Sequence, residues 1–238
     1  QNFPSTAPNN TIIFIIGDLP DLYSNNFETN IDDWEIGAPS DLASAGIWEF
    51  ADPVATYNDD GYLVQPGEDH TEDGSYCFVT GNGFEEGNGG FDDVDNGATT
   101  LLSPLFDLSD FDEVILTYYR WYTNNIGDNG GSDKWIVSVS NNGGATWIDL
   151  ENSGASSTAW EKKRFILSDY IDFTDQMTFR YVAEDILYDG DAGSGGSLVE
   201  AAVDDFLIEY LSDNVGILGD INGDESIDVL DVVLLVNM

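Results

Sequence analysis

The residues from Trp135 to Leu150 constrain the fold more than any other segment, because they predict two strands joined by a tight turn. Apolar and small polar residues alternate from Trp135 to Ser140, which is the two-residue period of a β-strand. Asn141–Gly144 interrupts the run, and Thr146–Leu150 resumes it. Asn and Gly tolerate the positive φ angles of a tight hairpin. Val114–Tyr122, a β-branched and aromatic run, predicts a further strand, and the rest of the chain would have to cover the apolar face of the strand-turn-strand unit.

The rest of the chain predicts an all-β protein. Further strands are expected at Thr11–Ile16, Tyr76–Thr80 and Met177–Val182, whereas Asp18–Asn30 is typical of a connector and Asp52–Gly74 of a long acidic loop. No amphipathic helical pattern of useful length precedes residue 225. Many short strands separated by Gly-rich turns favour an antiparallel β-sandwich.

The charge balance is extreme, with 46 acidic residues against 6 basic ones and a formal net charge of -40. Such a surface repels nucleic acid and anionic membranes. Two interpretations of the acids remain open: a highly soluble, salt-adapted surface, or calcium coordination where carboxylates cluster at turns beside Gly and Asn. The loop from Gly81 to Gly97 has that composition, and Asp93 and Asp95 within it are predicted calcium ligands.

Reactive residues are scarce. Cys77 is the only cysteine and His70 the only histidine, so the sequence predicts neither an intrachain disulfide nor a multi-histidine zinc site. No G-x-S-x-G sequence surrounds a serine. Paired carboxylates cleave glycosides in some enzymes, but in so acidic a chain any pair arises by chance. The chain is therefore predicted not to be an enzyme.

A series of separated motifs resembles the MAM-like jelly-roll module of secreted bacterial metallopeptidases, over about residues 26–210. The motifs occur in the expected order: Gly46-Ile47-Trp48-Glu49, Pro66-Gly67 before His70-Thr71, Val79-Thr80-Gly81, Asp93-Val94-Asp95 with Gly97, Leu102-Ser103-Pro104 before Asp107, Tyr119-Arg120-Trp121-Tyr122, Val139-Ser140-Asn141-Asn142-Gly143-Gly144, and Val199-Glu200-Ala201 with Val203-Asp204-Asp205-Phe206. The resemblance implies an antiparallel jelly-roll sandwich that binds calcium, is extracellular and bacterial, and has no catalysis of its own. It also implies Glu28, Asp204 and Asp205 as candidate calcium ligands.

The C-terminal segment 220–238 resembles half of a type I dockerin, an EF-hand-like calcium loop followed by a short helix. Oxygen-bearing residues fall at positions one, three, five, nine and twelve counted from Asp220, which is the spacing of a calcium-binding loop. Glu225 stands where the sharp turn prefers Gly. The predicted calcium ligands are Asp220, Asn222, Asp224, Ser226, Asp228 and Asp231, and residues 211–219 are predicted to be a linker.

Apolar segments near both termini predict contacts with other molecules. The N-terminal region 1–25 is expected to be extended, with a strand at 11–16 that pairs within its own sheet or is donated to a neighbour. The C-terminal apolar run cannot bury its face with one short helix. The residues predicted to mediate assembly are Ile12, Ile13, Phe14, Ile15, Ile16, Val232, Val233, Leu234 and Leu235.

Two functions follow from these patterns. The first is a calcium-stabilised extracellular structural protein that assembles with copies of itself or with another extracellular protein, as a filament or surface-matrix subunit. The alternative is an accessory carbohydrate- or protein-binding module of a secreted hydrolase system. Exposed indole rings would favour the alternative, because sugar rings stack on aromatic faces. Trp34, Trp48 and Trp160 are the candidate rings.

Overall fold

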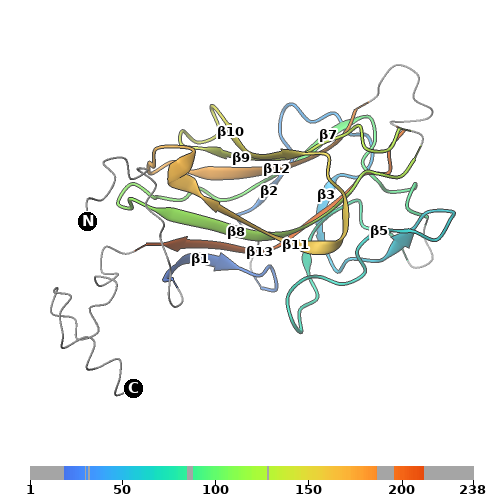
Figure 1. Ribbon diagram of the computed structural model, residues 1–238, viewed down its shortest axis with the longest axis horizontal. Helices are drawn as coiled ribbons and strands as arrows, with labels where there is room; N and C mark the ends of the chain where they lie inside the picture. Colours follow the sequence, from blue (N-terminus) through green and yellow to red (C-terminus); the bar gives the residue numbers. More distant parts are fainter. Residues whose placement is uncertain are drawn as a thin grey trace, which may run out of the picture.

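The computed structural model describes residues 19–29, 31, 33–84, 88–127, 129–186 and 196–211. Two antiparallel sheets lie face to face, as Figure 1 shows, and together they form a jelly-roll sandwich. One sheet has the order β11-β8-β13-β6-β3 with β1 beside β13, and the other has the order β10-β9-β12-β7-β2. The strands are β1 (Asp21–Asn25), β2 (Glu35–Ile36), β3 (Trp48–Ala51), β4 (Thr56–Tyr57), β5 (Leu63–Gln65), β6 (Cys77–Thr80), β7 (Gly97–Leu102), β8 (Val114–Thr123), β9 (Trp135–Ser140), β10 (Ile148–Ser153), β11 (Ser157–Ile166), β12 (Thr178–Asp185) and β13 (Glu200–Tyr210).

The predicted central unit is confirmed. β8 and β9 match the two expected runs, and β9 pairs antiparallel with β10 across the Asn-Gly turn. Trp135, Val137 and Val139 are fully buried in the core. The intervening side chains of β9 lie on the outer face of the sheet, as the period-two pattern requires.

The core between the sheets is rich in aromatic rings. Trp34, Tyr181 and Phe206 lie in it, and the ring centroids of Trp34 and Phe206 are 5.2 Å apart at 85°. Edge-to-face pairs of this kind are favoured by the ring quadrupoles. The only helical element among the described residues is the short 3-10 helix η1 (Leu167–Asp169). None of the described helices is long and apolar enough to span a membrane.

A β-bulge divides β13 into two halves. The pairing of β13 with β8 shifts between Asp204 and Leu207, and Asp205 at this point has a φ of 48°. Ala201 and Val203 point into the core before the bulge, whereas Phe206 and Ile208 do so after it. The extra residue therefore shifts the alternation by one and leaves two consecutive carboxylates, those of Asp204 and Asp205, beside the same loop.

Two expectations are wrong, and one strand was not predicted. β1 lies within the predicted N-terminal extension and pairs with β13, so the sandwich begins before the expected boundary at residue 26. β4 and β5 form a small sheet of their own inside the predicted long loop. β3 is the strand that was not predicted. The segments 11–16, 211–219 and 220–238 were also given predicted structures; apart from Leu211, they lie outside the described residues.

Candidate functional site

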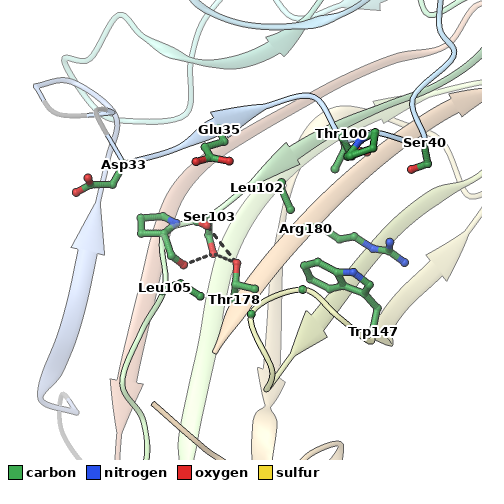
Figure 2. A pocket seen from close by; sticks show the side chains of 15 residues that line it. Asp33, Glu35, Ser40, Thr100, Leu102, Ser103, Leu105, Trp147, Thr178 and Arg180 are labelled. Atoms are coloured by element: carbon green, nitrogen blue, oxygen red, sulfur yellow. Dashed lines mark hydrogen bonds between the residues drawn. The ribbon is translucent and has the colours of Figure 1, made fainter. Parts of the chain in front are cut away.

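A cleft of about 850 Å³ opens on the outer face of the sheet that contains β7 and β12. Its floor is formed by Leu102 and Thr178, which point outward from these two strands. Loop residues around Pro39 form one wall, and the turn between β9 and β10 forms another. Figure 2 shows Trp147 and Arg180 together on one side, with Asp33 and Glu35 on the opposite side. The volume is within the usual range for small-molecule sites.

The β9–β10 turn places Trp147 at the cleft. Asn142 Oδ1 accepts the backbone N–H of Thr146 at 2.9 Å, and Asn142 Nδ2 donates to Thr146 Oγ1 at 2.8 Å. Gly144 has a φ of 86°, and a Cβ at this position would lie 3.2 Å from the indole of Trp147. A side chain at position 144 would therefore both strain the backbone and press on the ring. The indole itself is half-buried, so part of it remains open to the cleft.

Arg180 is held against this indole. Its guanidinium carbon lies 4.6 Å from the centroid of the Trp147 ring, which is a cation–π contact. Arg180 Nε donates to Ser138 Oγ at 3.2 Å, and Ser138 in turn donates to Asp149 Oδ1 at 2.8 Å. The side chain is thus held by two direct contacts, the Trp147 ring and the Ser138 hydroxyl, and the hydroxyl is itself held by Asp149.

The opposite wall depends on Asp41. Asp41 Oδ2 accepts the backbone N–H groups of Ala38 and Thr100 at 2.9 and 2.8 Å, and its Oδ1 accepts the hydroxyl of Thr100 at 2.7 Å. These bonds fasten the loop after β2 to strand β7. Asp33 and Glu35, which precede this loop, are both exposed at the rim.

The three tryptophans predicted to bind ligand do not line this cleft. Trp34 is 8% exposed and Trp48 is 2% exposed, and both lie in the core, so the expectation of open rings is wrong for them. Trp160 is half-buried on β11, where its Nε1 donates to the carbonyl oxygen of Glu68 at 3.2 Å. Trp160 belongs to the other sheet and stays a prediction.

The ligands implied by the MAM-like resemblance lie around the loop at residues 69–75. Asp204 Oδ2 accepts the backbone N–H groups of His70 and Thr71 at 2.7 and 3.2 Å. Asp205 Oδ2 lies 2.5 Å from His70 Nδ1. Burial raises the pKa of Asp204 to about 7. Most of the oxygens of this aspartate pair are therefore already used in holding the loop.

Glu28 and Asp69 meet on the other side of the same loop. Glu28 Oε1 accepts the N–H groups of Ser75 and Tyr76 at 3.0 and 2.9 Å. Asp69 Oδ2 is buried without a hydrogen-bond partner. A Cβ at Gly74 would lie 2.2 Å from this oxygen and 2.8 Å from Glu28 Oε1. Burial, followed by the charges of Glu28 and other neighbours, raises the pKa of Asp69.

A second acidic cluster contains the predicted ligands Asp93 and Asp95. Asp93 is 3% exposed, and burial together with Asp95 and Asp185 raises its pKa from 3.8 to about 8. Glu200 is fully buried beside it and accepts the hydroxyl of Thr80 at 2.9 Å. Burial and the charge of Asp93 raise the pKa of Glu200 well above its ordinary value.

Neither cluster is arranged as a formed metal site. Among the residues that the structure describes, no three acidic, histidine or cysteine side chains meet closely enough to hold one ion. The unpartnered Asp69 oxygen and the all-oxygen donor set suit a hard cation, whereas the hydrogen bonds of Asp204 and Asp205 occupy two of the implied ligands. The remaining predicted ligands, Asp220 to Asp231, lie outside the described residues, as do the predicted assembly residues 12–16 and 232–235.

The chain matches no protein-family model and no curated protein sequence. Among solved structures it is similar to the K1 cleaved adhesin domain of Lys-gingipain from Porphyromonas gingivalis, with 15% identity over 80% of this chain and 98% of that one, at a TM-score of 0.44. It is also similar to TmCBM61 in complex with β-1,4-galactotriose, with 12% identity over 78% and 94% of the chains and a TM-score of 0.44.

A third similar structure is the xylan-binding domain of CBM 22, with 10% identity over 82% of this chain and 97% of that one, at a TM-score of 0.40. These proteins are jelly-roll carbohydrate-binding modules and adhesin domains of secreted bacterial proteins. The fold assigned to this chain follows from its own strand pairing, and the chemistry of the cleft follows from its own residues.

Sequence reasoning missed the cleft and found only part of the acidic clusters. The cleft residues come from the segments around 33–40, 100–105, 143–147 and 178–180, and no local pattern joins them. One feature could have indicated the ring: Trp147 lies three residues after Gly144, close to the Asn-Gly turn, and turns often carry binding residues. Asp69 was missed because it lies in a segment that is acidic throughout.

Proposed function

We propose that this chain is a non-catalytic, extracellular carbohydrate-binding module that binds its ligand in the cleft over β7 and β12. The observation that carries the proposal is the half-buried Trp147 indole, held by Arg180 beside an apolar floor and polar rims. The floor includes Leu102 and Leu105, the latter 57% exposed. Sugar rings present apolar C–H faces and hydroxyl edges, and a site that mixes one aromatic ring, apolar carbons and convergent polar groups complements both.

Replacing Trp147 with alanine is expected to weaken binding of a responsive polysaccharide by about tenfold or more, because Trp147 is the one aromatic ring among the 15 described residues that line the cleft. Affinity gel electrophoresis against a polysaccharide panel that includes xylan and β-1,4-galactan measures this change. Trp160→Ala is the matched control, since that ring is also half-buried but lies on the other sheet.

Two results would contradict the proposal. The first is that no polysaccharide of a broad panel retards the folded wild-type protein. The second is that Trp160→Ala abolishes binding while Trp147→Ala leaves it intact, which would move the site to the outer face of the β11 sheet. Circular dichroism of each variant confirms that the sandwich is folded before binding is compared.

We also propose that calcium stabilises the sandwich at the loop of residues 69–75, where Glu28 and Asp69 approach each other. Two carboxylates that approach each other in a partly buried place repel, and a hard cation bound between them would relieve that repulsion. Asp204 and Asp205 hold the loop that carries Asp69. Asp93 and Asp95 are the second candidate pair, and the loop at 220–231 stays a predicted third site.

Calcium is therefore expected to raise the melting temperature, and a chelator to lower it. A ligand at a hundred times its Kd stabilises a fold by about 2.7 kcal/mol. Asp69→Asn should reduce this calcium-dependent shift, whereas Asp110→Asn, at an exposed acid before β8, should not. Differential scanning calorimetry with calcium and with EDTA gives the comparison. An identical melting temperature in the two conditions would disprove calcium stabilisation.

Assembly through the terminal segments remains a separate prediction. Its residues lie outside the described part of the chain, and the cleft supports the binding-module function instead. Size-exclusion chromatography of the full chain at rising concentration measures whether it forms polymers. A strictly monomeric elution at high concentration would count against assembly.

A further inference from the structure

The cleft contains a single cation, which at first suggests a ligand with a negative charge. Of the 15 residues that line it, all of them described, only Arg180 is basic. Guanidinium groups bind carboxylates and sulfates strongly when their N–H groups are available. Whether Arg180 can serve in this way therefore determines the class of glycan that the cleft accepts.

Arg180 is already engaged by groups of the protein itself. Its guanidinium lies over the Trp147 ring at 4.6 Å, and its Nε–H is donated to Ser138 at 3.2 Å. Burial lowers the pKa of Arg180, and the carboxylates of Asp149 and Asp41, which are not among the lining residues, act against this at longer range. One face of the guanidinium and its Nε–H are therefore occupied by the protein itself, which leaves only the terminal N–H groups for a ligand.

The opposite rim carries uncompensated negative charge. Asp33 and Glu35 both line the cleft and are exposed. In the described part of the chain, the ion pairs formed by Lys, Arg and His involve Asp205, Glu151 and Glu161, and neither of these two acids. Figure 2 shows both carboxylates across the cleft from Arg180. A ligand lying between the two walls would come close to Glu35, and Asp33 adds its negative charge at the outer rim.

We propose that the cleft selects uncharged glycans and rejects glycans that bear carboxylate or sulfate groups, with Asp33 and Glu35 as the residues that determine this specificity. The inference rests on the proposed carbohydrate-binding function. Arg180 acts here as a support for the Trp147 ring, and hydroxyl groups of a neutral sugar donate to the rim carboxylates. An anionic sugar meets one partly engaged cation, Arg180, and places its charge in a cleft that also carries two acids.

The test compares pairs of ligands that differ only in charge. Cellotriose, mannotriose and β-1,4-galactotriose are titrated by isothermal calorimetry, each against the same trisaccharide oxidised to carboxylate at C6. The wild-type protein is expected to bind at least one neutral trisaccharide and to bind its oxidised partner at least about tenfold more weakly, because like charges placed together at an interface are costly.

A double variant locates the effect. The double variant Asp33→Asn, Glu35→Gln should reduce the ratio of the dissociation constants of the oxidised and the neutral ligand several-fold. Asp110→Asn with Asp112→Asn is the matched control, since it removes the same charge from exposed positions outside the cleft. A general repulsion by the net charge of -40 would respond equally to both double variants, whereas selection at the rim responds only to the first.

The possible outcomes test the charge selection and the carbohydrate-binding function separately. The charge selection is wrong if an oxidised trisaccharide binds as tightly as its neutral partner or more tightly. It is also wrong if the Asp33/Glu35 variant leaves the difference in affinity between the two ligands unchanged. In both cases the binding function still holds. Failure of both neutral and oxidised trisaccharides to bind, together with failure of the polysaccharide panel, overturns the binding function itself. A gap that narrows only in the Asp33/Glu35 variant supports both.

Discussion

Replacing Arg120 with methionine is expected to lower the free energy of unfolding by about 3–5 kcal/mol. Arg120 lies on β8 with its side chain 2% exposed, and it forms ion pairs with Glu151 at 2.7 Å and Glu161 at 2.8 Å. β10 carries Glu151 and β11 carries Glu161, so this one guanidinium connects an edge strand of each sheet. Without it, the 12% exposed Glu151 side chain would stay charged beside the core, with only Lys163, at 3.5 Å, as an ion-pair partner. Urea unfolding measures the loss.

A double-mutant cycle separates the lost ion pair from lost packing. Tyr118 and Trp135 both donate to Glu151 Oε2, at 2.9 and 3.2 Å, and Gln at position 151 retains an acceptor for them. Glu151→Gln in the Arg120→Met background should therefore recover part of the stability, which gives a coupling energy between the two sites. A loss of less than about 1 kcal/mol for Arg120→Met, or strictly additive effects, would show that the pair stabilises little.

Replacing Asp93 with asparagine is expected to stabilise the protein above about pH 8, by roughly 2 kcal/mol or more, and to flatten its pH dependence. Burial first, then Asp95 and Asp185, raise the pKa of Asp93 from 3.8 to about 8. The folded state therefore holds a proton that the unfolded state releases across this range. The protonated Asp93 contributes fully to the free energy of unfolding below the pKa of the unfolded state. This contribution is lost as the pH rises through the pKa of Asp93 in the folded state. Asparagine keeps a carbonyl acceptor and never ionises.

Urea unfolding from about pH 5 to about pH 9, with and without calcium, tests this prediction. The wild-type protein should lose stability across the range when calcium is absent, and the variant should lose much less. Asp110→Asn, at an exposed position, should follow the wild type. Curves for wild type and Asp93→Asn that run parallel would mean that Asp93 ionises normally in the fold. If Asp93 binds calcium, the ion should stabilise the wild type most at high pH and should not stabilise the variant in the same way.

The sequence predicts the long central strands well, for two different reasons. β9 alternates from Trp135 to Ser140 because only one of its faces meets the core, whereas β8 is buried along nearly its whole length and is recognised by its β-branched and aromatic composition. β3, β4 and β5 are two to four residues long, and a period-two pattern cannot be read over so few positions. β1 has the polar sequence Asp-Leu-Tyr-Ser-Asn and owes its place to pairing with β13, which no local propensity encodes.

The candidate sites could be predicted only in part, for a related reason. Asp204 and Asp205 are adjacent in sequence, and Asp93 and Asp95 nearly so, so short-range patterns find them. Their partners Asp69 and Glu200 lie far away in the sequence, and only the fold brings them close to these aspartates. The same is true of Trp147 and Glu35, which face one cleft from segments more than a hundred residues apart. Trp34 and Trp48 illustrate the opposite error, because ring size does not reveal whether a ring faces solvent or core.

Because of the bulge in β13, the alternation of core-facing and outward-facing side chains has one phase before Asp204 and another after Asp205. Counted from Ala201, every second side chain enters the core as far as Val203, and the count restarts at Phe206. If the same residues paired regularly, without the bulge, Phe206 and Ile208 would turn toward water. Removing one residue at Asp204 or Asp205 would keep both side chains in the core but leave a single carboxylate beside the loop at residues 69–75. Homologues of this chain that keep the aspartate pair are therefore expected to keep the bulge, and a designer who transfers the strand to another protein has to transfer the bulge with it.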